Sequence, residues 1–155
     1  MPKALRDALV VALKAGDVEA ARASLEADPA PFTARKAVQE ALADAPTVDR
    51  LIEAGVRAKI GRALSIPYKG QVREMIPRGI TNGVISVEVY ARTHEIVIAD
   101  LPIDEKLAFA AEPKTEGEHL TYCLMLMGSS RKNEVPKFAG KCPALKDLIV
   151  ATAGK

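Results

Sequence analysis

The residues best suited to metal or thiol chemistry are two histidines and two cysteines, and all four lie in the second half of the chain. His119 and Cys123 are four residues apart, a spacing that places both side chains on one face of a helix or of a strand. Together with His94 and Cys142 they form a candidate four-ligand zinc site, since Zn²⁺ favours imidazole and thiolate. No Cys-x-x-Cys pair accompanies them, and cysteines in apolar runs are usually small buried hydrophobes. Metal binding is therefore an alternative hypothesis, and no cofactor is predicted.

Cys142 is also a candidate reactive thiol. It precedes Pro143 and a predicted helix, and a helix N-terminus with a neighbouring lysine lowers a thiol pKa. The segment from His94 to Pro102, together with Cys142-Pro143, resembles parts of the organic-hydroperoxide-resistance family. That resemblance implies a two-cysteine peroxidase using Cys123 and Cys142, but these are only 19 residues apart. A small thiol- or metal-dependent enzyme using these two cysteines with His94 and His119 is thus an alternative, and the enzyme question stays open.

A basic segment is the candidate binding site. Residues 57–78 contain six cationic residues and a single acidic residue, Glu74, so the segment carries a net charge of +5. Such a segment can contact phosphates, but it has only Tyr68 for base stacking. Most such segments form a solvated face, or they contact an acidic surface of the same protein or of a partner protein, and nucleic-acid binding is the alternative. The six residues are Arg57, Lys59, Arg62, Lys69, Arg73 and Arg78.

Length and composition limit the class of protein. A chain of 155 residues predicts one domain, or one compact domain with an appendage. Apolar residues make up 48% and aromatic residues 4%, so the core must be built from Ala, Val, Leu and Ile. No apolar run reaches the length of a membrane-spanning helix, so no membrane partner is expected. Two cysteines make no disulfide framework, which indicates a reducing, cytoplasmic location.

The elements that must position these residues are organised around a β-rich stretch, residues 82–101. Ile85, Val87 and Val89 alternate with more polar residues, which predicts a strand with one apolar face. Asn82-Gly83 predicts a tight type I′ turn from a partner strand at residues 71–80. Residues 91–94 are expected either to form a hairpin turn or to bend a continuing strand. Pro77 cannot donate to a ladder, so its strand is placed at a sheet edge, where a homodimer could form by strand pairing.

The first third of the chain is predicted to form helical hairpins, with Asp17 and Thr33 as caps of the second and third helices. Gly55 is expected to end the fourth helix as a left-handed cap. Residues 15–22 and 48–55 resemble parts of ankyrin repeats, which would imply a partner-binding surface. Leu25-Glu26-Ala27 and Ile52-Glu53-Ala54, the matching segments, are 27 residues apart, against about 33 in that family. A small helical bundle is therefore favoured. The expected helices cover residues 3–15, 18–27, 33–42 and 48–54.

The pattern is less regular after Leu101. Residues 106–111 are predicted as a strand, residues 119–127 as a strand in slight preference to a helix, and residues 143–151 as a terminal helix. The sum is an α+β protein with about four N-terminal helices, an antiparallel sheet of about four or five strands, and a C-terminal helix. We expect a helical region at 1–64 and a sheet region at 65–155, in one or two compact domains. The leading functional hypothesis is a non-enzymatic interaction or adaptor protein.

Overall fold

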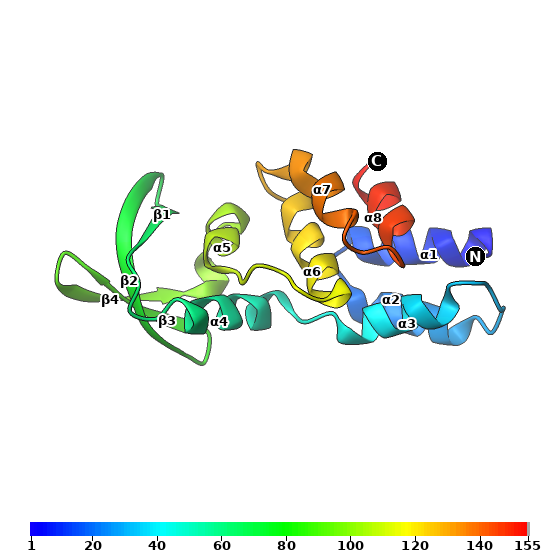
Figure 1. Ribbon diagram of the computed structural model, residues 1–155, viewed down its shortest axis with the longest axis horizontal. Helices are drawn as coiled ribbons and strands as arrows, with labels where there is room; N and C mark the ends of the chain where they lie inside the picture. Colours follow the sequence, from blue (N-terminus) through cyan, green and yellow to red (C-terminus); the bar gives the residue numbers. More distant parts are fainter. Residues whose placement is uncertain (155) are drawn as a thin grey trace. The chain divides into compact units, whose positions relative to one another are not determined.

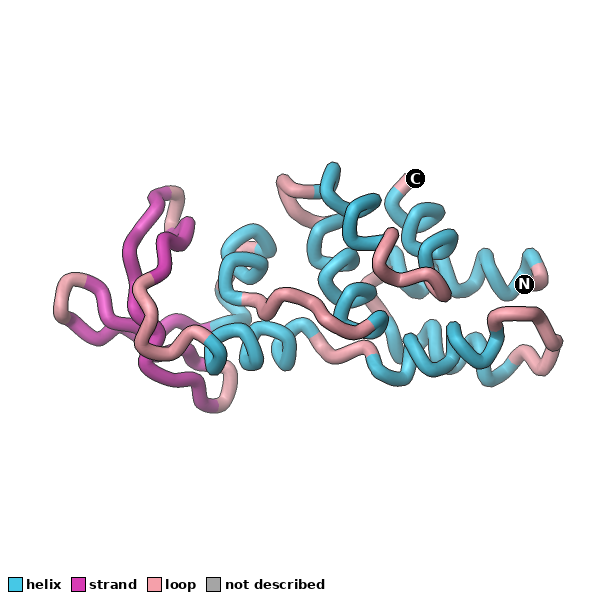
Figure 2. Tube along the Cα trace, in the orientation of Figure 1, coloured by secondary structure: helices cyan, strands magenta, loops and turns pink. Residues whose placement is uncertain are grey.

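The computed structural model describes residues 1–154, and within them the chain is an α+β protein, as predicted. Four α-helices come first, then a four-stranded antiparallel sheet, then four further α-helices that include the C-terminal one, and Figure 1 labels them in this order. Figure 2 shows that the strands follow one another along the chain without an intervening helix. None of the helices within residues 1–154 is long and apolar enough to cross a membrane.

The contacts within the chain define two compact units. Unit 1 consists of Met1–Pro46 together with the chain from Pro113 onward, and unit 2 is Thr47–Glu112. The predicted division at residue 64 follows the change from helices to strands along the sequence. The units instead group segments by their contacts, so the first three helices belong with the last three.

Unit 1 is a helical bundle whose neighbouring helices bury Ala- and Leu-rich faces. α1 packs on α2 and α8, α3 packs on α2 and α6, and α7 packs on α6 and α8. Leu9, Leu25 and Leu42 are among its fully buried side chains. The helices are α1 (Lys3–Lys14), α2 (Val18–Ala27), α3 (Arg35–Asp44), α6 (Glu116–Met127), α7 (Val135–Ala139) and α8 (Lys146–Ala153).

The predicted strand at residues 119–127 is wrong, because this segment belongs to helix α6. Thr115 caps the helix by accepting a hydrogen bond from the Glu118 amide, while the Glu118 carboxylate accepts one from the Thr115 amide. This capping box starts a helix whatever the polarity of the following residues. The helix is buried on most sides, which explains its continuous apolar sequence.

The other predictions in unit 1 differ mainly at the boundaries. Asp17 caps α2 through the Ala20 amide, as predicted. α3 begins after Ala34 without a side-chain cap, so the capping role of Thr33 is wrong. The terminal helix starts at Lys146 rather than at Pro143. The short helices α7 and η2 (Lys132–Glu134) were not expected.

Unit 2 is a four-stranded meander with two helices, and its strand order is β1-β2-β3-β4. α4 (Val48–Ala58) contacts β2, and α5 (Ile103–Phe109) contacts β1 and α4. Asn82 and Gly83 both have positive φ, which confirms the predicted type I′ turn. The strands are β1 (Leu64–Tyr68), β2 (Gln71–Thr81), β3 (Val84–Val89) and β4 (Arg92–Val97), followed by the single turn η1 (Ile98–Asp100).

One face of this sheet is apolar, as the alternation in β3 predicted. Ile85, Val87 and Val89 are buried, and their neighbours on β4 are Ile96, His94 and Arg92 respectively. Paired residues of adjacent strands lie on the same face. On β2 this face carries Pro77, Met75 and Arg73. Pro77 lies opposite Val87 of β3. Met75 and Arg73 lie opposite Leu64 and Ile66 of β1, respectively.

Three predictions in unit 2 are wrong. Residues 106–111 are not a strand, because Pro102 and the acids in the first turn start helix α5. The hairpin turn consists of Tyr90 and Ala91, both at positive φ, and β4 begins at Arg92. Gly55 lies inside α4 instead of ending it, because the backbone after α5 packs directly on this glycine.

A further prediction in unit 2 is wrong, because the strand that contains Pro77 does not lie at a sheet edge. β2 is the second strand of four, but its pairing with β1 stops at Met75. Pro77 lies beyond that point and beside a bulge in the pairing with β3, a position where proline removes no ladder bond. Its carbonyl accepts a hydrogen bond from the Gly61 amide.

Candidate functional site

A pocket on the apolar face of the sheet brings together side chains that can bind an anion. It has a volume of about 280 Å³, which is close to the lower end of the range for ligand pockets. Its lining combines apolar side chains with Lys69, Arg73 and His94. We call it the sheet pocket; it is lined by Tyr68, Lys69, Arg73, Met75, Val87, Val89, His94, Glu95 and Ile96.

The turn between β1 and β2 places Lys69 in the lining of the sheet pocket. Lys69 and Gly70 both have positive φ, as the two central residues of a type I′ turn require. The buried carboxylate of Glu105 on α5 accepts a hydrogen bond of 2.7 Å from the Lys69 amide, which ties the turn to the helix. The Lys69 ammonium lies 5.3 Å from the centroid of the Tyr68 ring, within the range of a cation–π contact.

Arg73, near the start of β2, supplies the second cation. Its register partner is Ile66 of β1, so its side chain projects from the apolar face. The Nε atom is buried and has no hydrogen-bond partner in the part of the chain that the structure describes. An unpaired buried donor costs free energy, and an anion in the pocket would offer it an acceptor.

The acids of the sheet lie mainly on its other face. Glu74 and Glu88 line a separate pocket with Ile76 and Tyr90, and Glu88 is the register partner of Ile76. Glu95 borders the sheet pocket, but it stands between His94 and Ile96 on β4, so its side chain projects to the opposite face. Strand alternation therefore separates the charges and leaves the sheet pocket with cationic side chains.

The remaining residues of the basic segment do not gather at this pocket. Arg57 forms an ion pair with Glu53, and Arg78 forms one with Glu88 at 2.7 Å. The Lys59 ammonium lies 3.5 Å from the Ala108 carbonyl, and burial lowers the pKa of Lys59 although Glu112 opposes this effect. Arg62 is exposed. The structure thus brings only two of the six predicted residues together.

The two histidines occupy very different environments. His94 is exposed on β4 in unit 2, whereas His119 is buried in unit 1 together with Cys123 and Cys142. His119 Nδ1 lies 2.7 Å from the Thr115 carbonyl oxygen, which satisfies the ring inside its own helix. Within residues 1–154 no three or more His, Cys, Asp or Glu side chains are arranged to hold a metal ion.

Both cysteines are free thiols in the core of unit 1. Burial raises the pKa of Cys123 to about 12, with a further contribution from Cys142. Burial, followed by the nearby Glu116 carboxylate, raises the pKa of Cys142 to about 11. The predicted lowering of the Cys142 pKa is therefore wrong. Its thiol lies 3.4 Å from the Glu116 carbonyl oxygen, and the next helix starts only at Lys146.

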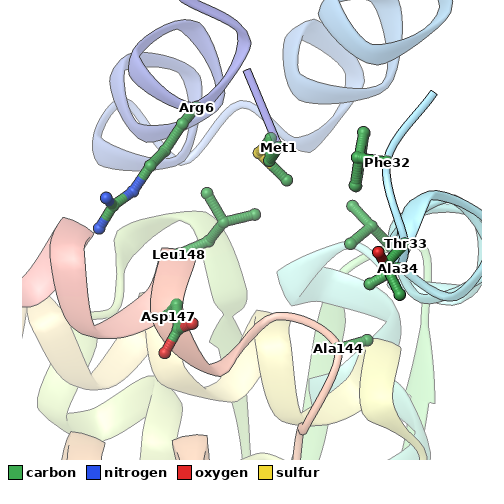
Figure 3. Close-up of a pocket in the computed structure, with 9 residues that line it drawn as sticks. Met1, Arg6, Phe32, Thr33, Ala34, Ala144, Asp147 and Leu148 are labelled. Atoms are coloured by element: carbon green, nitrogen blue, oxygen red, sulfur yellow. The ribbon is translucent and has the colours of Figure 1, made fainter. Parts of the chain in front are cut away.

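A second pocket, of about 360 Å³, lies within unit 1 between α1, α8 and the segment that enters α3. Figure 3 shows Arg6 and Asp147 on one side of Leu148, with Phe32 and Thr33 on the other. The charges of Arg6 and Asp147 oppose each other and both side chains are exposed. This pocket therefore favours no ligand charge, in contrast to the sheet pocket.

One feature of the sequence pointed to the sheet pocket. Arg73 and Met75 are two residues apart, and so are His94 and Ile96, which places a cation or an imidazole on the apolar face of each strand. Charge counting alone favoured the whole segment from Arg57 to Arg78. The chain matches no protein family, and neither a curated protein sequence nor a solved structure is significantly similar to it.

Proposed function

We propose that this chain is a non-enzymatic binding protein whose sheet pocket holds an acidic side chain of a partner protein. The observation that carries the proposal is the presence of Lys69 and Arg73 together in the lining of one pocket that also contains apolar side chains. A carboxylate placed there would accept hydrogen bonds from both cations. The Arg73 Nε atom, which is buried without a partner among the described residues, would be one of the donors.

The volume of the sheet pocket suits a side chain of a partner protein as the ligand. About 280 Å³ is small for a cofactor or a drug-sized molecule, whereas a glutamate or aspartate with a neighbouring apolar residue fits such a volume. The apolar lining residues Met75, Val87 and Val89 would contact the methylene groups of that segment. A cytoplasmic location belongs to the same proposal, because both cysteines are free thiols.

The distribution of charge favours a protein over a nucleic acid. A phosphate backbone is bound by a row of cations that neutralise several phosphates at once. Here Arg57 and Arg78 are already paired with acids, which leaves Lys69 and Arg73 as the pair that faces one site. Two converging cations suit a single carboxylate, and charge-assisted hydrogen bonds of this kind contribute about 1.5–3 kcal/mol each.

The test is a bead-bound library of heptapeptides with Glu or Gln at the centre and Val, Ile, Thr, Ser or Lys elsewhere. The full chain should select Glu over Gln, and Arg73→Ala or Lys69→Ala should weaken binding of the selected peptides roughly 10- to 150-fold. Arg62→Ala is the matched control, because it removes one charge of the same segment from an exposed position outside the pocket.

Three results would overturn the proposal. The first is selection without preference for Glu, and the second is an equal loss of binding in Arg62→Ala, which would indicate diffuse electrostatic attraction. The third is tighter binding of a poly-U or poly-dT oligonucleotide than of any peptide, with an affinity that falls steeply with salt. That third result would establish the nucleic-acid alternative.

A further inference from the structure

The outer edge of β4 is open on the side away from β3. Within residues 1–154, β3 is the only strand that pairs with β4. Residues 92–95 are exposed, and the Val97 side chain is 43% exposed. An edge of this kind presents unpaired backbone N–H and C=O groups that can pair with another extended segment.

The hairpin turn fixes which backbone groups of β4 point outward. Tyr90 and Ala91 form a two-residue turn at positive φ, so the flanking pair Val89 and Arg92 exchanges hydrogen bonds. Alternation then directs the backbone groups of His94 and Ile96 towards β3. Those of Thr93 and Glu95 point away from the sheet, towards any strand added at this edge.

The same edge borders the sheet pocket, because the pocket is lined by His94, Glu95 and Ile96 of β4. Residues opposite each other on paired strands have side chains on the same face. A residue placed opposite His94 in an added strand would therefore project onto the face that carries Arg73. Its neighbours would project to the other face, beside Glu95, where a lysine or threonine fits best.

We infer that the partner binds as an extended acidic segment that adds a fifth strand alongside β4 and places its carboxylate next to His94. The inference rests on the proposed function, since the pocket cations select the acid, while the backbone of Thr93 and Glu95 holds the segment. Charge complementarity with Lys69 and Arg73 and the shared boundary of pocket and edge argue for this occupant. The recognised pattern is an acid between polar or basic neighbours, with apolar residues two positions away on either side.

The strand can be tested by replacing Glu95 with proline. The Glu95 N–H points away from β3, so proline removes a donor at the edge and no bond of the existing ladder. Glu95→Ala is the matched control because it removes the side chain and keeps the N–H. For the peptide Lys-Val-Thr-Glu-Thr-Val-Lys, Glu95→Pro should bind about tenfold more weakly than Glu95→Ala.

A second measurement does not depend on the folding of a variant. Two N-methylated versions of the same peptide can be compared, one methylated at the even-numbered and one at the odd-numbered backbone nitrogens. Methylation of the set that points towards β4 should abolish binding, and methylation of the other set should leave it nearly unchanged. Equal affinities of Glu95→Pro and Glu95→Ala, or equal effects of methylation in both phases, would overturn the strand while leaving the pocket intact. Insensitivity to Arg73→Ala, or no binding by any library peptide, would instead overturn the proposed function and the strand with it.

The remaining occupant of the edge is a second copy of the chain. Sedimentation velocity of the chain alone should give a monomer for the wild type and for Glu95→Pro. A dimer that dissociates in Glu95→Pro would show that β4 pairs with its own copy, and it would overturn the inference of an acidic partner segment.

Discussion

Replacing Gly55 with alanine would place a methyl group inside the backbone that follows α5. A Cβ atom at this position would lie 2.1 Å from the Phe109 carbonyl oxygen and 2.4 Å from the Ala111 nitrogen. Backbone atoms cannot rotate away as a side chain can, so α4 and the segment after α5 must separate by about 1 Å. The hydrogen bond from the Ala111 amide to the Leu51 carbonyl, 3.0 Å long, crosses the same contact.

The expected cost is the difference between opposing effects. Overpacking costs about 1–3 kcal/mol, and weakening the Leu51–Ala111 hydrogen bond adds about 1 kcal/mol. Alanine is favoured over glycine in the middle of a helix by about 1 kcal/mol. We therefore expect Gly55→Ala to lower the free energy of unfolding by about 1–3 kcal/mol, in spite of its better helix propensity.

Urea unfolding of the full chain, followed by far-ultraviolet circular dichroism, measures this change. Gly79→Ala is the matched control in unit 2, because a Cβ there meets nothing within 4 Å. Gly55→Asn should be less stable than Gly55→Ala, since the larger side chain meets the same backbone. If Gly55 were instead a left-handed helix cap, asparagine would be tolerated better than alanine. That order of stabilities, or an unchanged Gly55→Ala, would refute the reasoning.

Further predictions concern the thiols and the cap of α6. Burial raises the pKa of Cys123 to about 12 and that of Cys142 to about 11. Iodoacetamide should therefore alkylate both thiols slowly at neutral pH until urea unfolds the chain. Rapid alkylation of the folded protein would contradict this. The folded state favours the neutral thiols, so their contribution to stability is complete below the ordinary thiol pKa of about 8.5 and is lost as the pH rises through 11–12. Urea midpoints should therefore fall less steeply with rising pH in Cys123→Ala. Thr115→Ala should cost about 1 kcal/mol in urea unfolding and Thr115→Ser much less, whereas equal losses would exclude the cap.

The strands in the middle of the chain show which features local sequence patterns can predict. β-branched residues alternate along β3, and Asn82-Gly83 adopts the positive φ values that its turn requires. These features depend on neighbours in sequence, so the residues alone predict the β2–β3 pairing next to the turn, whereas the bulge between Pro77 and Gly79 shifts the register farther from it. The failures have a common cause. α6 is buried on most sides, so its apolar sequence carries no period, and the local signals of a helix were its Leu and Met content and the capping box at Thr115 and Glu118.

The sheet pocket depended on contacts that no local pattern contains. The sequence indicated that Lys69 and Arg73 belong to a basic segment, but it gave them no priority over Arg57 or Arg78. Ion pairs with Glu53 and Glu88 set the latter two apart, and a buried carboxylate from α5 fixes the turn of Lys69.

By itself, then, the sequence determined the fold class, the alternation of β3 and the turn between β2 and β3, because helical and strand periods and turn residues act over a few positions. Only the tertiary structure decided that Gly55 belongs inside a helix, that the cysteines are buried, and that two cations of six share a pocket with His94. Those outcomes depend on which segments, remote in sequence, pack against each residue. Such packing is decided by the tertiary structure and not by neighbouring residues.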